Sequence, residues 1–262
     1  MDIKSQGRLS VRHTVSSRVD PERNAAVGGG VFAGVKLTLL SHAVWQFAFA
    51  LTFIASAPAR AGQPSPIMTT PGAMLAPDSF ASALPRTWHA AKGTWVAEGG
   101  VLRGTEIAAD KHQAVIRRPL AFTNAIITFS FRLGAARQIS LSINDAQEHV
   151  CRLLITPRDF VVRKDDHDHD GPDKPVEFAR VPLKFAPEEW HTAVVEIQGA
   201  EMVAQIDSGA KVGFGAHALL DRPKANLGFT VAGGPAEFRD ISITAAQPRA
   251  DWTETKRRLA AK

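Results

Sequence analysis

Apolar and polar residues alternate in two consecutive segments of this chain. Apolar side chains occupy every second position of residues 127–133 and again of residues 138–144, with Thr, Ser, Arg, Gln and Asn between them. A period of two is that of a β-strand, whose successive side chains point to opposite faces. Paired strands of this kind bury one face against a second layer and leave the other in water. The pattern therefore predicts layered antiparallel β-structure.

Short segments with strand-like composition continue as far as residue 244, and breakers such as the Gly-Gly-Pro run at 233–235 separate them. Many short strands with almost no helical period are typical of a two-sheet sandwich. We predict an all-β, two-sheet antiparallel jelly-roll sandwich over residues 78–246. Residues 62–77 are rich in Pro and lack a period, which predicts a linker. Residues 247–262 carry helix-forming residues and a cationic end, which predicts a short C-terminal helix.

The N-terminal part of the chain has the layout of a signal peptide. Residues 37–57 form an apolar run that follows Lys36 and precedes Ala59 and Ala61, the small residues expected before a cleavage site. We predict an N-terminal extension and signal peptide over residues 1–61, and an exported, periplasmic or extracellular protein. An uncleaved segment would instead be a membrane anchor, since the run is just long enough to span a bilayer. Residues 1–34 are polar and Gly-rich, which suggests that the true start lies near Val35.

Charge and cysteine content exclude some functions. The net charge of +5 comes largely from residues 1–61, which hold seven Lys and Arg against three Asp and Glu, so the rest of the chain is nearly neutral. Without a basic stripe, binding to nucleic acid has little electrostatic basis. The single cysteine, Cys151, excludes an internal disulfide. Its strand-like surroundings favour a buried thiol over a nucleophile, which would need a His and Asn or Asp signature.

Three segments carry a family resemblance: Trp95 to Gly104, with its Gly-Gly pair, Trp190 to Ile197, and Ala236 to Ile241. Together with the long alternating strand they resemble a concanavalin A-like jelly roll. More narrowly, they resemble the secreted bacterial 3-keto-disaccharide hydrolase domain family, long described as a domain of unknown function. The resemblance implies a carbohydrate partner and hydrolysis of a glycoside or 3-keto-glycoside. A lectin-like binding module without turnover and a structural envelope protein remain alternatives.

Polar residues of the two alternating segments fall on one polar face by parity. Hydroxyl-rich ligands need fixed donors and acceptors together with an aromatic surface. We therefore expect substrate to be bound by Arg132, Asn144, Arg152, Lys164 and Trp190. Among the histidines, His149 is the candidate acid or base, with Asp165 as its partner. The alternative is a solvated outer face, strand-end histidines bonded to the backbone, and a tryptophan in the core.

An acidic loop follows Lys164 with the sequence Asp-Asp-His-Asp-His-Asp-Gly. Its spacing matches a calcium loop, with oxygen ligands at the first, third, fifth and twelfth positions. The flanking segments predict strands where a calcium loop has helices, and the alternating His and Asp also suit a transition metal. A solvated hairpin loop is the alternative. The candidate ligands of calcium or another divalent metal are Asp166, Asp168, Asp170 and Glu177.

Overall fold

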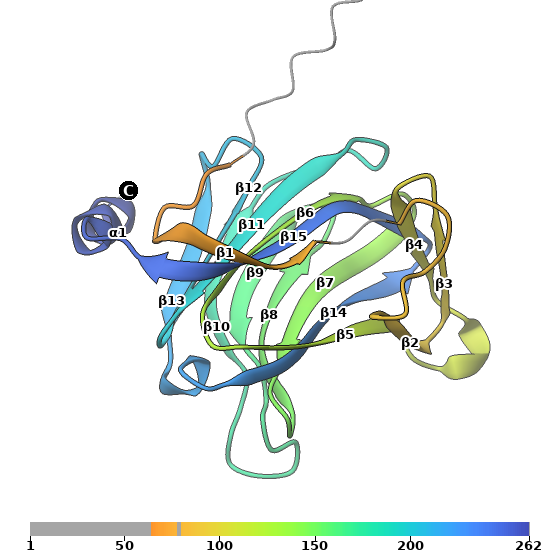
Figure 1. Ribbon diagram of the computed structural model, residues 1–262, viewed down its shortest axis with the longest axis horizontal. Coiled ribbons are helices and arrows are strands. Elements are labelled where there is room, and N and C mark those ends of the chain that lie inside the picture. Colours follow the sequence, from red (N-terminus) through yellow and green to blue (C-terminus); the bar gives the residue numbers. More distant parts are fainter. Residues whose placement is uncertain (1–63, 78–79, 262) are drawn as a thin grey trace, which may run out of the picture. The chain divides into compact units, whose positions relative to one another are not determined.

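The computed structural model describes residues 64–77 and 80–261, and the predicted signal peptide lies outside these residues. The described chain forms two antiparallel sheets and a C-terminal helix, α1 (Trp252–Ala260), as Figure 1 shows. Sheet A has the order β13-β12-β11-β6-β15-β4-β3, with β1 paired to β15, and sheet B has the order β10-β9-β8-β7-β14-β5-β2. The all-β sandwich and the C-terminal helix predicted from the sequence are therefore confirmed.

The strands have these bounds. Sheet A contains β1 (Thr69–Pro77), β3 (Thr94–Glu98), β4 (Val101–Thr105), β6 (Ala125–Arg132), β11 (His191–Gln198), β12 (Glu201–Ile206), β13 (Val212–Ala216) and β15 (Ala236–Pro248). Sheet B contains β2 (His89–Lys92), β5 (Ala114–Phe122), β7 (Ala136–Asn144), β8 (His149–Ile155), β9 (Asp159–Lys164), β10 (Val176–Pro182) and β14 (Lys224–Gly233).

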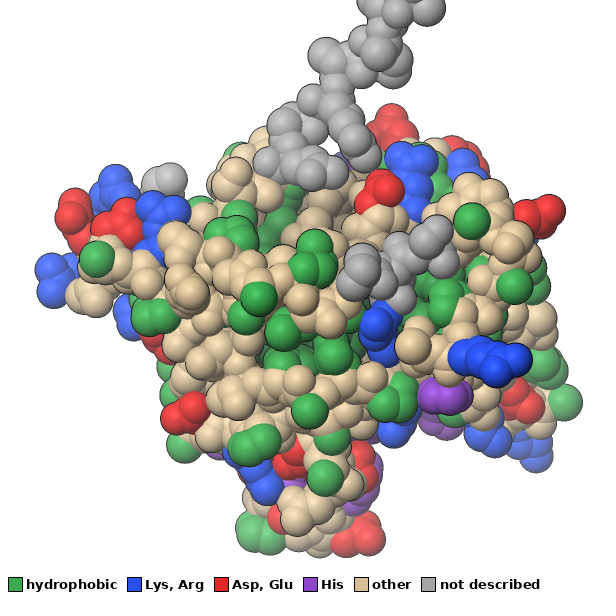
Figure 2. Space-filling model, in the orientation of Figure 1, with side chains coloured by type: hydrophobic (Ala, Val, Ile, Leu, Met, Phe, Trp, Pro, Cys, Tyr) green, Lys and Arg blue, Asp and Glu red, His purple; other side chains and the backbone are tan. Residues whose placement is uncertain are grey.

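The core lies between the two sheets. Phe129 and Phe238 of sheet A meet Phe229 of sheet B, and the Phe229 and Phe238 rings stack with centroids 4.4 Å apart. Trp88 and Trp95 are buried in the same cluster. Hydrophobic side chains gather toward the middle of the view in Figure 2, whereas acidic and basic side chains concentrate around its margin. Alternation within each strand thus places its apolar set between the layers.

The two alternating segments form strands as predicted, β6 and β7, but these strands do not pair with each other. β6 pairs with β11 and β15 in sheet A, and β7 pairs with β8 and β14 in sheet B. The connection between them passes from one layer to the other. The expectation of one shared polar face was therefore wrong: Arg132 lies on the outer face of sheet A, and Asn144 lies on the outer face of sheet B.

The segment predicted as a linker belongs in part to the sandwich. Residues 69–77 form β1, which pairs with β15 and runs along it in Figure 1. Met68 packs with Val203 and Trp252 in a second, smaller apolar cluster on the outer face of sheet A. The segment just before β1, together with α1, thus covers part of this face. No helix of the described part of the chain is both long and apolar enough to cross a bilayer.

Candidate functional site

A cavity of about 470 Å³ lies on the outer face of sheet B. β5, β7, β8 and β14 form its floor, and the segment that precedes β5 contributes Glu106, Lys111 and His112 to its wall. This volume falls within the range of small-molecule sites. The cavity lies on the opposite side of the sandwich from α1 and the segment before β1, which makes it the candidate functional site.

Strand register places three arginines in one row across this face. Arg117 on β5 is opposite Gly228 on β14, which is opposite Ser142 on β7, followed by Arg152 on β8 and Arg163 on β9. Glycine is required in this row, since a Cβ atom at position 228 would lie 2.0 Å from the Ile116 carbonyl oxygen. The two short residues, Gly228 and Ser142, lie side by side between Arg117 and Arg152, which leaves room for a ligand above them.

Asn144 is the centre of a hydrogen-bond network in the cavity. Its Oδ1 atom accepts hydrogen bonds from Ser142 Oγ at 3.0 Å and from His149 Nδ1 at 2.6 Å, while its Nδ2 donates to Asn226 Oδ1 at 2.6 Å. A carbonyl oxygen only accepts, so the hydrogen of this bond resides on His149 Nδ1. In the neutral ring, Nε2 is then the basic nitrogen, and it lies 3.4 Å from Glu148 Oε1.

Burial lowers the pKa of His149 below its ordinary 6.5, and the nearby positive charge of Arg152 lowers it further. These effects outweigh the attraction of Asp165 and Glu148. The imidazole is therefore neutral at pH 7, which suits a hydrogen-bond acceptor or a general base. By contrast, burial raises the pKa of the Cys151 thiol to about 12, so this inward-facing residue is not a nucleophile, as the sequence suggested.

Asp165 joins two of the three arginines of the row. Its Oδ2 lies 2.9 Å from Arg152 Nε and its Oδ1 lies 2.6 Å from Arg163 Nη2, and its side chain is only 3% exposed. Both carboxylate oxygens are thus occupied by guanidinium groups. Asp165 is near enough to His149 for its charge to act on the pKa of that ring, but its geometry is that of a residue that positions Arg152 in the cavity wall.

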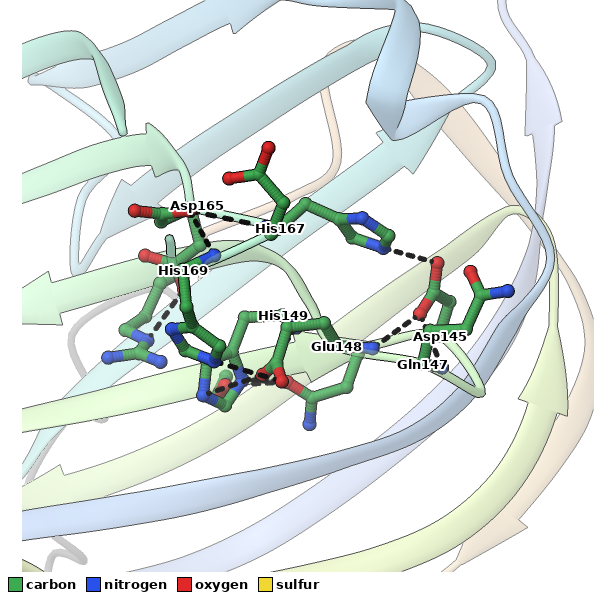
Figure 3. Close-up of polar contacts among 12 residues, drawn as sticks. Asp145, Gln147, Glu148, His149, Asp165, His167 and His169 are labelled. Atoms are coloured by element: carbon green, nitrogen blue, oxygen red, sulfur yellow. Dashed lines mark hydrogen bonds and ion pairs between the residues drawn. The ribbon is translucent and has the colours of Figure 1, made fainter. Parts of the chain in front are cut away.

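The loop between β9 and β10 is fastened to the turn between β7 and β8 by histidine and carboxylate pairs (Figure 3). His167 Nε2 lies 2.8 Å from Asp145 Oδ2, and His169 Nε2 lies 3.0 Å from Glu148 Oε2. Arg222 adds a further ion pair to Asp145 at 3.3 Å. Because Glu148 precedes His149, this cluster holds one end of the cavity in place.

Asp145 makes this fastening sensitive to acid. Burial alone would raise the pKa of Asp145, but hydrogen bonds from the amides of Glu148 and Gln147 and from the His167 ring lower it below its ordinary 3.8. A lowered pKa in the folded state stabilises the fold at pH values above the unfolded pKa, and that contribution is lost as pH falls through the folded pKa.

We therefore expect Asp145→Asn to cost about 1–2 kcal/mol at neutral pH through lost charged hydrogen bonds, and less in acid, where the Asp145 carboxyl of the natural protein becomes protonated. Urea denaturation across an acid pH series measures this, with Asp170→Asn as the control. Parallel pH profiles for Asp145→Asn and the natural protein would contradict the assignment.

The remaining predicted site residues do not converge on the cavity. Lys164 is buried, and its ammonium binds the Asp173 carboxylate and donates to the Lys174 carbonyl oxygen at 2.7 Å, so it anchors the base of the β9–β10 loop. Arg132 pairs with Glu237 and, like Arg239, lies over the Trp190 ring, at 5.1 and 4.0 Å from its centroid. Arg132 and Trp190 thus belong to sheet A and cannot contact a ligand held by Asn144 on sheet B.

The predicted metal ligands do not form a ligand set either. Asp166 Oδ1 accepts hydrogen bonds from the amides of Asp168 and His169, and Glu177 forms an ion pair with Arg180 at 2.7 Å. Asp168 Oδ2 accepts a hydrogen bond from the Asp173 amide, and Asp170 is exposed. Across residues 64–77 and 80–261, no three His, Cys, Asp or Glu side chains are grouped closely enough to hold a metal ion. Asp166, Asp168 and Glu177 therefore bond to backbone amides and to Arg180.

Several lining residues were not predicted from the sequence. Arg117 and Thr230 follow the outward parity of β5 and β14, a signal that was available once these segments were taken as strands. Lys111 and His112 come from an irregular segment, where no period exists to indicate their direction. Arg137 lies beside a register shift at the start of β7, which makes parity an unreliable guide.

No family model and no curated protein matches this sequence. Solved structures do match. A laminarinase from Rhodothermus marinus superposes with a TM-score of 0.51 at 12% identity, covering 68% of this chain and 99% of that one. The carbohydrate-binding module CBM66 from Bacillus subtilis gives a TM-score of 0.50 at 11% identity, covering 61% and 96% of the two chains. The apo Crh5 transglycosylase gives 0.50 at 11% identity, covering 70% and 89%.

The fold is a concanavalin A-like jelly roll. At 11–12% identity these likenesses concern the fold alone, and the three proteins include two enzymes and one binding module. The 3-keto-disaccharide hydrolase family inferred from the sequence stays a proposal. The fold alone does not determine the activity, which depends on the side chains that line the cavity.

Proposed function

We propose that the protein binds a carbohydrate in the cavity on the outer face of sheet B. The observation that carries this proposal is the network centred on Asn144, which holds Ser142 and His149 in fixed orientations within a cavity of suitable size. Sugar hydroxyls need directional donors and acceptors, and a rigid floor of strands supplies them with little loss of side-chain entropy. The carbohydrate-related names of structures with the same fold support the same class of ligand.

Binding without turnover is favoured over a two-carboxylate hydrolysis. A glycosidase of that type needs a pair of carboxyl groups on either side of the scissile bond. Of the described residues that line the cavity, Glu106 is the only carboxylate, and the nearby Asp165 is bound by two arginines. The predicted signal peptide would place this binding outside the cytoplasm.

The proposal is tested by titrating a panel of oligosaccharides and measuring heat by calorimetry. We expect Asn144→Ala to weaken binding by at least about tenfold, because it removes a fixed amide and releases the His149 ring. Trp190→Ala on sheet A is the matched control and should leave affinity unchanged. A loss only in Trp190→Ala would move the site to sheet A, and equal losses in both variants would contradict a site centred on Asn144.

A second proposal is hydrolysis of a 3-keto-glycoside, which the family resemblance implies. The observation in its favour is the neutral His149 ring, whose Nδ1 donates to Asn144 and whose Nε2, 3.4 Å from Glu148 Oε1, is the nitrogen suited to accept a proton as a general base. In this proposal Asp165 acts as a positioning residue through Arg152. Release of sugar from a 3-keto-glucoside that survives in His149→Ala would remove His149 from the reaction.

A further inference from the structure

Several cationic side chains that line the cavity form no ion pair with an acidic side chain of the described protein. Arg152 is neutralised by Asp165, but within the described part of the chain no acidic side chain forms an ion pair with Lys111, Arg117 or Arg137. Glu106 is the acidic residue of the lining, and its Oε2 accepts a hydrogen bond from the Gly233 amide at 2.7 Å. Three cationic side chains therefore face the ligand space with no ion-pair partner.

These charges are distributed along the cavity. Arg117 lies in the row of Ser142, whereas Arg137 lies five positions earlier on β7. A strand rises about 3.3 Å per residue, so the two backbone positions are separated by roughly 15 Å along the sheet. A single small anion would engage one end of this arrangement. A chain of sugars that carries an acidic group on more than one residue would engage both.

We propose that the ligand is an acidic oligosaccharide, whose carboxylate or sulfate groups bind Arg117 and Arg137 while its hydroxyls bind the Asn144 network. This inference rests on the proposed carbohydrate binding and names its ligand class. Guanidinium groups bind carboxylates and sulfates through paired, charge-assisted hydrogen bonds. Ser142 lies in the row of Arg117, and Asn144 with His149 lies two positions farther along β7, on the side away from Arg137, so these neutral donors and acceptors border the Arg117 end of the cavity.

The test uses ligands matched in all but charge. Tetragalacturonate is compared with its methyl ester, and a sulfated carrageenan tetrasaccharide with its desulfated form, by calorimetry at low and moderate salt. We expect at least one acidic ligand to bind about tenfold more tightly than its neutral partner, with affinity falling as salt rises. Which pair shows the difference identifies the acidic group as a carboxylate or a sulfate.

Arginine variants show which side chains cause the preference for an acidic ligand. Arg117→Gln and Arg137→Gln should each remove most of the preference for the acidic ligand, whereas Arg158→Gln, which removes an exposed arginine from the turn between β8 and β9, should not. Equal binding of charged and neutral partners, with a loss in Asn144→Ala, would overturn the acidic ligand and leave carbohydrate binding standing. Equal losses in all three arginine variants would also overturn it. Absence of binding by every saccharide would overturn both proposals.

Discussion

Replacing Asp165 by Asn is expected to lower the free energy of unfolding by about 3–5 kcal/mol, the cost of breaking a buried ion pair by removing one partner. Arg152 and Arg163 are directly opposite each other on neighbouring strands, and like charges in that position repel. Asp165 contacts both guanidinium groups from a side chain that is almost fully buried. Without the Asp165 carboxylate, two partly buried arginines remain side by side with no negative charge between them.

Chemical denaturation measures this cost, with Asp170→Asn as the control for loss of one carboxylate from the exposed part of the adjoining loop. A double variant, Asp165→Asn with Arg163→Gln, should recover part of the stability, because it removes one of the repelling charges. An Asp165→Asn protein as stable as the natural one, or a double variant with additive losses, would show that Asp165 does not hold this pair together.

The fold class could be predicted from the sequence because the alternation of apolar and polar residues can be recognised within each strand by itself. Phe129 and Phe131, like Leu141 and Ile143, are buried as their parity predicted. Parity does not say which strand is the neighbour, however. The connection from β6 to β7 changes sheets, and this long-range choice depends on partners such as β11 and β14 that are far away in the sequence.

Because parity does not identify the neighbouring strand, the sequence predicted only part of the candidate site. Asn144, His149 and Arg152 lie on adjacent strands that are close in sequence, and all three line the cavity. Arg132 and Trp190 were assigned to the same surface because both are polar or amphipathic on an outer face, yet a sandwich has two outer faces. Arg117 completes the row only through pairing of β5 with β14, which no local pattern encodes.

Glu196 explains why the Pro-rich N-terminal segment joins the sandwich. Its carboxylate, buried on β11, accepts hydrogen bonds from the backbone amides of Ile67, Met68 and Thr69 at 2.7–2.9 Å and from the Thr69 hydroxyl at 2.7 Å. These amides precede or begin β1. Composition predicted a linker here, because the group that fixes the segment lies more than a hundred residues away.

We expect Glu196→Ala to lower the free energy of unfolding by about 3–5 kcal/mol, because it leaves the buried amides of Met68 and Thr69 and the partly buried amide of Ile67 without acceptors. Glu196→Gln keeps one acceptor oxygen and should cost less. Denaturation gives the size of the loss, and hydrogen exchange of the amides at 67–69 gives its location, with the exposed Glu189→Ala as control. If those amides stayed protected in Glu196→Ala, pairing of β1 with β15 alone would hold the segment. If they exchanged freely while sheet B stayed protected, the N-terminal strand would be a separately released edge of sheet A, fixed by one carboxylate.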